Sequence, residues 1–214
     1  MRKPRNIIIF GPQGSGKGTQ AQLLADNFGY IYISTGDIFR RHVKNKTQLG
    51  KQSLKYIKSG RLMPDEITNK IALVEISKPK AKTNGFILDG YPRNLAQTKF
   101  LNEKVKITDA VVINLTDAKA ARRIGGRRVC ACGRTYHIIY NPPKKSGLCD
   151  VCGKKLFIRD DDKPAAIKKR LKIYHQQTEP ILKLYQKLGV LKIVAGKPPI
   201  PEVFKLVKKA LYLH

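Results

Sequence analysis

The sequence predicts an α/β fold, namely a doubly wound, five-stranded parallel sheet with two inserted mobile subdomains. The first observation is a set of short apolar, mostly β-branched runs, at residues 6–10, 30–34, 86–88, 110–115 and 190–194. These runs are apolar at consecutive residues, which favours strands buried on both faces, and helix-period stretches separate them. The second observation is a glycine-rich loop directly after the first run. Ligands are therefore expected at the carboxyl ends of the strands.

The loop after the first run, residues 11–19 (GPQGSGKGT, hereafter the phosphate loop), contains four glycines and one lysine. Gly11, Gly16 and Lys17 fit the pattern G-x-x-x-x-G-K of a nucleotide P-loop. Bare backbone N–H groups, a helix N-terminus and a lysine converging on one place suit a polyphosphate. The fold is thus of the P-loop NTPase type. One departure is Gly18, because a P-loop normally has Ser or Thr there, and Thr19 comes only one residue later.

Two connections are too long to be simple crossovers. The first insertion, residues 34–71, contains helical pieces, and the second insertion, residues 125–163, is rich in Gly, Pro and Cys. Both are expected to lie over the ligand edge of the sheet, where such segments can close as lids that exclude water. The remaining residues form the core domain, which comprises 1–33, 72–124 and 164–214.

The segment FILDGYPR ends the third run with Asp89 and continues to Arg93. A carboxylate at that strand end can orient the hydration shell of Mg²⁺ beside the phosphate loop. The alternative is a helix-capping aspartate in a Gly-Tyr-Pro turn. The companion segment STGD at residues 34–37 favours the magnesium interpretation.

Later elements are predicted from local signals. We expect Asp161 and Asp162 to cap the helix that begins at Pro164, and that helix to kink or restart at Pro180. The C-terminal Leu211, Tyr212 and Leu213 are expected to cover the core rather than form an interface.

Five motifs together resemble the adenylate kinase family in its long-lid form: GPQGSGKGTQ, STGDIFR, GFILDGYPRNLAQ, RRIGGRRV and RDDDKPAAIKKRL. The resemblance extends from Ile7 to about Lys205, and the motifs stand in family order. It also accounts for Gly18, because GxxGxGKGT is the phosphate-loop motif of this family. It implies reversible, Mg²⁺-dependent transfer of the γ-phosphoryl group of ATP to AMP, giving two ADP, with lid closure over the phosphates.

The resemblance assigns roles residue by residue. The donor phosphates would be held by loop residues, namely Gly14, Ser15, Gly16, Lys17, Gly18 and Thr19. The acceptor would be held by Arg40, Gly90 and Arg93 around its phosphate and by Thr35 and Gln97 near its base. Arg123 would lie against the donor base, and Asp89 would serve the magnesium water shell. Five residues would converge on the transferring phosphoryl group: Lys17, Arg93, Arg127, Arg159 and Arg170. Of these, Arg127 would also contact ATP.

The chemistry of phosphoryl transfer gives a reason, separate from the resemblance, to expect arginines at this site. Phosphoryl transfer leaves little covalent work to side chains, so positioning and neutralising the charge on the equatorial oxygens supply most of the acceleration. A guanidinium is always charged and binds phosphate oxygens in a bidentate fork.

All four cysteines, Cys130, Cys132, Cys149 and Cys152, lie in the second insertion. Such clustering predicts a structural zinc site that cross-links a segment too small for its own core. The first pair has one intervening residue where zinc-bearing lids of the resembling family have two, which predicts a distorted or weaker site. Free thiols and a disulfide remain alternatives. His137 is expected to pack or hydrogen-bond rather than bind metal.

The formal net charge of +28 favours polyanionic partners. The basic residues are spread along the chain, so no specific nucleic-acid role is expected, although a basic P-loop and zinc-ribbon module that binds nucleic acid is the competing hypothesis. No signal peptide or membrane-spanning run is visible, so a cytoplasmic protein without a membrane partner is expected. The expected partners are ATP and AMP. Another acceptor base stays open, and a monomer is the family default.

Overall fold

The computed structural model describes residues 4–213. The seven strands of this part of the chain are β1 (Arg5–Phe10), β2 (Ile31–Ser34), β3 (Gly85–Asp89), β4 (Asp109–Asn114), β5 (Arg127–Val129), β6 (Thr135–His137) and β7 (Leu191–Ala195). The α-helices are α1 (Lys17–Phe28), α2 (Thr35–Lys44), α3 (Gln48–Ser59), α4 (Asp65–Ile76), α5 (Pro79–Asn84), α6 (Leu95–Lys104), α7 (Asp117–Gly125), α8 (Pro164–Ile173), α9 (Glu179–Lys187) and α10 (Ile200–Ala210).

The central sheet has five strands in the order β2-β3-β1-β4-β7, and every neighbouring pair is parallel. The strand β1 lies between β3 and β4, with Ile8 opposite both Leu88 and Ala110. All five apolar runs of the sequence are strands of this sheet, which confirms the predicted doubly wound α/β fold.

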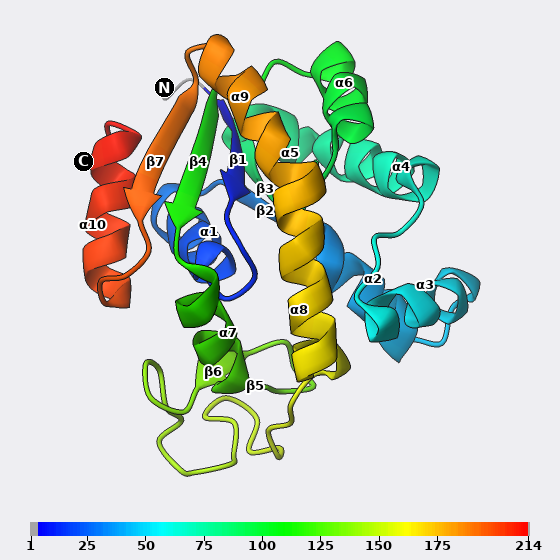
Figure 1. Cartoon of the computed structure of the whole chain (residues 1–214), viewed down its shortest axis with the longest axis vertical. Helices are drawn as coiled ribbons and strands as arrows, with labels where there is room; N and C mark the ends of the chain where they lie inside the picture. Colours follow the sequence, from blue (N-terminus) through cyan, green and yellow to red (C-terminus); the bar gives the residue numbers. More distant parts are fainter. Residues whose placement is uncertain (1–3, 214) are drawn as a thin grey trace.

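Helices cover both faces of the sheet, and alternate residues of β1 supply each core. Ile7 and Ile9 pack with residues of α1 and α10, whereas Ile8 and Phe10 pack with residues of α4, α5, α6 and α9. Figure 1 shows α10 and the α8–α9 arm on opposite sides of the central strands. Leu211 and Leu213 are buried in the α1–α10 core, as expected, while Tyr212 is exposed.

Both insertions lie toward the carboxyl edge of the sheet (Figure 1). The first insertion is helical, with α2 and α3 packed on each other, and α4 runs across its expected boundary at 71–72. The second insertion contains only the short antiparallel pair β5–β6 and a single 3₁₀ turn, Asp160–Asp162. The strand β1 opens into the phosphate loop at the same edge.

Two predictions about α8 and α9 have different outcomes. The helix does restart at Pro180: a π-helical turn, Tyr174–Thr178, separates α8 from α9, which begins at Glu179. Proline lacks an N–H and its ring crowds the preceding turn, so the wider turn accommodates it. The prediction that Asp161 and Asp162 cap α8 is wrong. Lys163 occupies the N-cap position of α8, and no side chain caps the helix there. The carboxylates of Asp161 and Asp162 are instead bound by arginines.

Candidate active site

Glycine is required at two points of the phosphate loop. Gly14 has a φ of 89°, and a Cβ there would lie 2.4 Å from the carbonyl oxygen of Ala120 in α7. Gly16 has a φ of 94° and is the cap residue of α1. These left-handed conformations, which other residues rarely adopt, let the loop curl over the start of α1. Its backbone can then face a phosphate.

The unusual Gly18 has a spatial explanation. A Cβ at this position would come within 3.3 Å of both Asp89 Oδ2 and the Tyr32 hydroxyl, which itself donates to Asp89 Oδ2 over 3.0 Å. A serine or threonine would crowd this pair. Glycine therefore allows the carboxylate at the end of β3 to approach α1 closely, and Asp89 offers the oxygen chemistry that a hydrated Mg²⁺ prefers.

Polar groups in and beside the phosphate loop lack protein partners. Ser15 Oγ and Gln13 Oε1 are buried, and neither has a hydrogen-bond partner among residues 4–213. Burial lowers the pKa of Lys17 to about 8, opposed by Asp89 and reinforced by the charges of Arg93, Arg170 and Arg127. Buried polar groups are normally paired, and a buried cation surrounded by arginines calls for an anion. Both features fit a phosphate ligand.

Two adjoining cavities lie beside the phosphate loop. One is lined by the loop residues Gln13 and Lys17. The other is lined by residues of the first insertion, including Arg40, and by Gln97. Residues that line both cavities are Gly60, Leu62, Gly90, Arg93 and Arg170. The two spaces therefore meet at two arginines.

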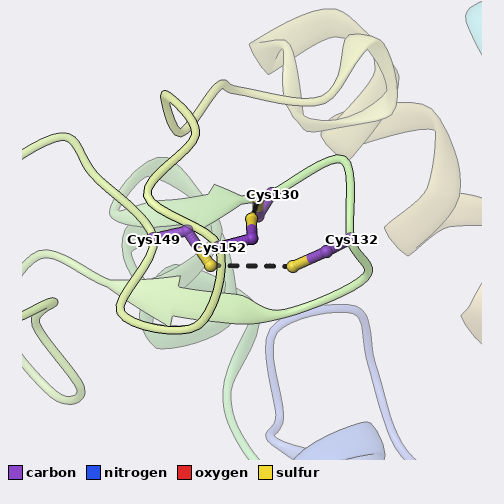
Figure 2. A group of neighbouring side chains, drawn as sticks. All are labelled: Cys130, Cys132, Cys149 and Cys152. Atoms are coloured by element: carbon purple, nitrogen blue, oxygen red, sulfur yellow. Dashed lines mark hydrogen bonds between the residues drawn. The ribbon is translucent and has the colours of Figure 1, made fainter.

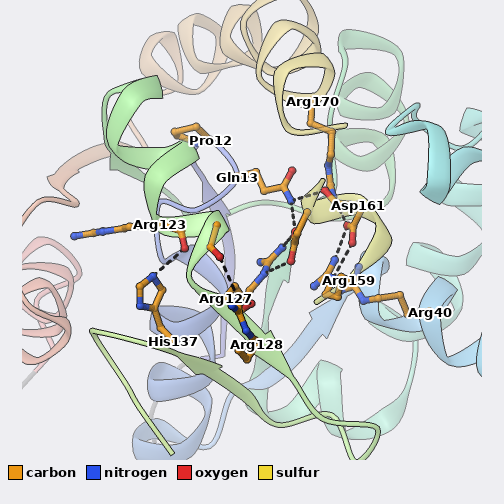
Figure 3. Close-up of polar contacts among 12 residues, drawn as sticks. Pro12, Gln13, Arg40, Arg123, Arg127, Arg128, His137, Arg159, Asp161 and Arg170 are labelled. Carbon is orange, nitrogen blue, oxygen red and sulfur yellow. Dashed lines mark hydrogen bonds and ion pairs between the residues drawn. The ribbon is translucent and has the colours of Figure 1, made fainter. Parts of the chain in front are cut away.

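Asp161 is surrounded by guanidinium groups. Arg159 binds it in a bidentate fork, with N···O distances of 2.8 and 2.6 Å, and Arg170 donates to Asp161 Oδ2. Burial opposes the charge on Asp161, but the hydrogen bonds and charge of Arg159 and the charge of Arg170 prevail and hold its pKa far below the usual value. Figure 3 shows Arg40, Arg159 and Arg170 approaching Asp161 from different elements.

Asp162 links the second insertion to the phosphate loop. Arg127 at the start of β5 donates Nε to Asp162 Oδ2 over 2.8 Å, and its second nitrogen donates to Oδ1. The Gln13 amide donates to the same Oδ1 over 3.0 Å. Four arginines, hereafter the arginine cluster, come from four separate places in the chain: Arg93, Arg127, Arg159 and Arg170.

Arg123 lies apart from the arginine cluster and points the other way (Figure 3). Its guanidinium donates to the carbonyls of Gly196 and Lys197 and lies 5.1 Å from the centre of the Tyr140 ring. Its guanidinium is thus used by backbone carbonyls and an aromatic ring rather than by the carboxylates that bind the arginine cluster. Thr19 is exposed at the start of α1.

The residues expected to hold an acceptor lie around one cavity. The carbonyl of Gly90 accepts from Thr35 Oγ1 over 3.0 Å and from Arg93 Nε over 2.7 Å. A Cβ at Gly90 would come within 2.8 Å of the Arg93 guanidinium, and its φ is 76°. Arg40 pairs with Asp37. The backbone oxygen of Arg93 accepts from Thr178 in the π-helical turn, which ties this arginine to the core.

The four cysteine sulfurs converge on one point despite the short first spacer (Figure 2). All four Sγ atoms lie within 4.8 Å of one another, and the shortest separations are 3.4 Å for Cys130–Cys152 and 3.6 Å for Cys132–Cys149. Zinc–sulfur bonds of about 2.3 Å in a tetrahedron place sulfurs about 3.8 Å apart. A disulfide requires about 2.05 Å, and all four thiols are free. The four cysteines could hold a metal ion.

The one-residue spacer is accommodated by a tighter turn. The Gly133 N–H donates to the carbonyl of Cys130, whereas in the second pair Gly153 donates to Cys149 one residue further along. Both glycines have positive φ values, 97° and 68°. The Tyr136 hydroxyl hydrogen-bonds Cys149 Sγ and lowers the pKa of that thiol to about 6, which favours the thiolate that binds metal. The expected distortion does not keep the sulfurs apart.

His137 hydrogen-bonds within the second insertion, as expected. Its Nδ1 accepts from the N–H groups of Ile139 and Tyr140, and its Nε2 lies 2.9 Å from the carbonyl of Arg123. These partners define a neutral ring protonated at Nε2. Burial also lowers the pKa of His137, which favours the neutral ring. Both ring nitrogens are therefore occupied by hydrogen bonds to the backbone.

Sequence reasoning missed the roles of four residues of this region: the hydrogen bonds of Gln13 and Asp65 and the ion pairs of Asp161 and Asp162. The run of three aspartates after Arg159 was a usable signal, because the chain has only 15 acidic residues against 43 basic ones. The role of Asp65, which accepts from Gln97 in another helix, leaves no mark on local sequence.

Comparison with known proteins agrees with this geometry. The family model described as adenylate kinase matches residues 9–190. An adenylate kinase of Methanothrix thermoacetophila is 47% identical over 211 residues, which is 96% of this chain and 98% of the relative. One of Caldicellulosiruptor saccharolyticus is 46% identical, with 96% and 98% covered, and one of Agathobacter rectalis is 45% identical, with 94% and 96% covered. In the described part of the chain, no helix combines the length and apolarity that a membrane crossing needs. The chain belongs to the adenylate kinase family of phosphotransferases.

Proposed function

We propose that the protein transfers the γ-phosphoryl group of Mg²⁺-bound ATP to AMP reversibly, giving two ADP. The observation that carries this proposal is the pair of cavities that meet at Arg93 and Arg170. One cavity is lined by Lys17 and the other by Arg40, and a cation in each supports the binding of one anionic nucleotide at each place. Family membership supports the same reaction.

The donor nucleotide would lie along the phosphate loop. Its phosphates would be held by backbone N–H groups and side chains of the loop, namely Gly14, Ser15, Gly16, Lys17, Gly18 and Thr19. The unpartnered Ser15 Oγ and the depressed pKa of Lys17 support this role. Arg123 would lie against the donor base, beside Tyr140, and Arg127 would contact the donor phosphates.

The acceptor would occupy the other cavity. Arg40 and Arg93 would bind its phosphate, beside the bare backbone of Gly90, and Thr35 and Gln97 would contact its base. All of these residues line that cavity, which supports their assignment as one set.

In the transfer step, an oxygen of the acceptor phosphate forms a bond to the γ-phosphorus while the bond from that phosphorus to the β-phosphate oxygen breaks. Lys17 and the arginine cluster would neutralise the charge that spreads over the equatorial oxygens. Asp161 and Asp162 keep the guanidiniums oriented without nucleotide, because they offset the mutual repulsion of these cations. Incoming phosphates would then take over this role.

Two metals fit the donor sets of the chain. When bound with the nucleotide, Mg²⁺ would neutralise phosphate charge, and Asp89 would hold its water shell through carboxylate oxygens. Four thiols suit Zn²⁺, which would act structurally in the second insertion and take no part in the chemistry.

We propose further that the two insertions are separate units, residues 34–71 for the acceptor and residues 125–163 as a lid. Their different secondary structure supports this, with α2 and α3 in the first insertion and β5–β6 in the second. The two units touch where Lys44 Nζ in α2 donates to the carbonyl of Ala131, the residue between the first two cysteines, over 2.9 Å. Closure would bring the arginines of the lid over the phosphates and exclude water.

An assay of ADP formation from Mg·ATP plus AMP, with each nucleotide omitted in turn, tests the proposal. We expect ADP only when both nucleotides and magnesium are present. Salt-dependent, tight binding of single-stranded nucleic acid without any phosphoryl transfer would instead establish the competing hypothesis.

A further inference from the structure

Gln97 is a buried amide in the wall of the cavity that also contains Arg40. Its Oε1 accepts the backbone N–H of Arg93 over 2.8 Å. Its Nε2 donates to Asp65 Oδ1, at the start of α4, over 2.7 Å. The backbone N–H of Gln97 donates to Asn94 Oδ1, and Asn94 Nδ2 in turn donates to both oxygens of Asp65. The amide is therefore held from both ends.

These two partners fix which end of the amide is oxygen. A backbone N–H can only donate, and a carboxylate can only accept. If the amide rotated by half a turn, its oxygen would face the Asp65 carboxylate and its NH₂ group would face the N–H of Arg93. Two partly buried hydrogen bonds, one of them charge-assisted, would be replaced by two repulsive contacts. The observed orientation is the only one that the surroundings satisfy.

The Gln97 amide keeps one unused hydrogen-bond acceptor at its oxygen and one unused donor at its nitrogen. Oε1 has a second lone pair, and Nε2 has a second N–H. An adenine ring offers the matching pair, a ring-nitrogen acceptor beside an exocyclic N6–H donor. In hypoxanthine or guanine the polarity is reversed, because O6 accepts and N1–H donates. Only a rotated amide would pair with that edge.

We propose that Asp65 determines base specificity by positioning Gln97: its carboxylate locks the amide in the orientation that reads a 6-amino purine and rejects a 6-oxo purine. The inference rests on the proposed function in that Gln97 faces the acceptor base. Asp65 does not line the cavity, so it would act on the base only through Gln97. The N–H of Arg93 is the second half of the lock, and as a backbone group it cannot be removed by substitution.

Asp65 also has a plainly structural function, because it joins α4 to the start of α6 through Asn94. Loss of that function would weaken binding of every nucleoside monophosphate alike. Loss of the lock would instead change the ratio of the affinities for two nucleoside monophosphates that differ in their base. The two functions can therefore be separated by measuring discrimination rather than activity alone.

The test compares Asp65→Asn with Glu66→Gln, using AMP and inosine monophosphate as paired ligands. Both substitutions remove one negative charge from the first turn of α4, but Glu66 is exposed and has no part in the lock. The amide that Asp65→Asn introduces can accept from Gln97 or donate to it, so this variant removes the Asp65 half of the lock and leaves the half that the Arg93 N–H supplies. The ratio of Kd values by calorimetry and the ratio of kcat/KM values are measured for each variant, with thermal denaturation as a check on folding.

We expect Asp65→Asn to reduce the preference for AMP over inosine monophosphate by about tenfold to a hundredfold, the equivalent of one charge-assisted hydrogen bond. Glu66→Gln should leave the preference unchanged. An unchanged ratio in Asp65→Asn, or equal weakening of both ligands, would overturn the lock. If the wild-type protein binds AMP selectively but transfers no phosphoryl group, the proposed function fails while the Kd ratios still decide the lock.

Discussion

The first insertion and the second insertion lie toward the same edge of the sheet but are stabilised in different ways. In the first, α2 packs on α3, and Ile38 of α2 is buried in the main core while Phe39 is also buried. In the second, the small buried cluster is Cys130, Tyr136 and Cys149, with Leu156 partly buried against it. Its large apolar side chains are mostly exposed, namely Ile138, Ile139, Tyr140, Val151, Phe157 and Ile158.

The difference shows how a chain can stabilise an inserted segment without a hydrophobic core of its own. A segment of about 40 residues cannot bury enough apolar surface to fold alone, and a metal cross-link is one substitute. The first insertion instead continues into α4, whose Ala72 and Ile76 belong to the main core. The free energy that holds each insertion together should therefore respond to different perturbations.

Metal removal should have the largest effect and should act on the second insertion alone. Structural zinc sites contribute on the order of 10 kcal/mol of binding free energy to small folds. Dialysis of zinc-loaded protein against a chelator should therefore abolish protection from hydrogen exchange in residues 125–163. Protection in residues 34–71 serves as the internal control. Equal protection of residues 125–163 before and after chelation would show that their fold does not depend on metal.

Removing an arginine of the second insertion should damage transfer more than folding. We expect Arg127→Ala to lower kcat by about 10²- to 10³-fold, or about 2 to 4 kcal/mol of transition-state stabilisation. The matched control is Arg128→Ala, because that guanidinium donates only to backbone carbonyls in the structure. Steady-state kinetics with both nucleotides varied would check this, and near-normal turnover of Arg127→Ala would refute its assignment.

The same side-chain truncation should cost different amounts of stability in the two insertions. Ile38 is 8% exposed and Ile138 is 52% exposed. Ile38→Ala should lower the free energy of unfolding by about 2 kcal/mol, whereas Ile138→Ala should change it by less than about 0.5 kcal/mol. Urea denaturation of both variants provides the comparison. Similar losses would mean that the second insertion has an apolar core of its own.

The pH dependence of binding should separate the donor from the acceptor. Burial lowers the pKa of Lys17 to about 8, and a bound phosphate favours its protonated form. Donor affinity should therefore be constant between about pH 7 and 8, where the nucleotide phosphates are ionised, and fall as the pH rises above 8, by at most about 1.4 kcal/mol per pH unit. Acceptor binding, which we assign to guanidiniums, should stay nearly constant because arginine does not titrate there. Calorimetry in buffers of different ionisation enthalpy would detect the proton taken up, and a flat donor profile would contradict the role of Lys17.

Sequence patterns were sufficient for the sheet and the phosphate loop because their signals are local. Ile7, Ile8 and Ile9 are apolar in succession because both faces of β1 are buried, and the glycines that follow take conformations that other residues resist. The family resemblance added the arginines, whose positions no local rule predicts.

Signals that arise only in three dimensions were missed or misread. Asp161 and Asp162 precede Pro164 and so matched a helix cap, but the nearby guanidiniums bind carboxylates more strongly than a helix start does. Asp65 and Gln97 are far apart in sequence, and only the packing of α4 on α6 brings them together. The short cysteine spacer suggested a poor site, yet the left-handed Gly133 closes the turn one residue earlier.

The central claim is that two anionic nucleotides meet end to end between Lys17 and the arginine cluster. Inhibition by two adenosines linked through a polyphosphate chain tests it most directly, because one such molecule would fill both cavities. The account predicts one molecule bound per chain and competitive inhibition against both ATP and AMP. Inhibition that is competitive against only one of the two nucleotides would contradict it.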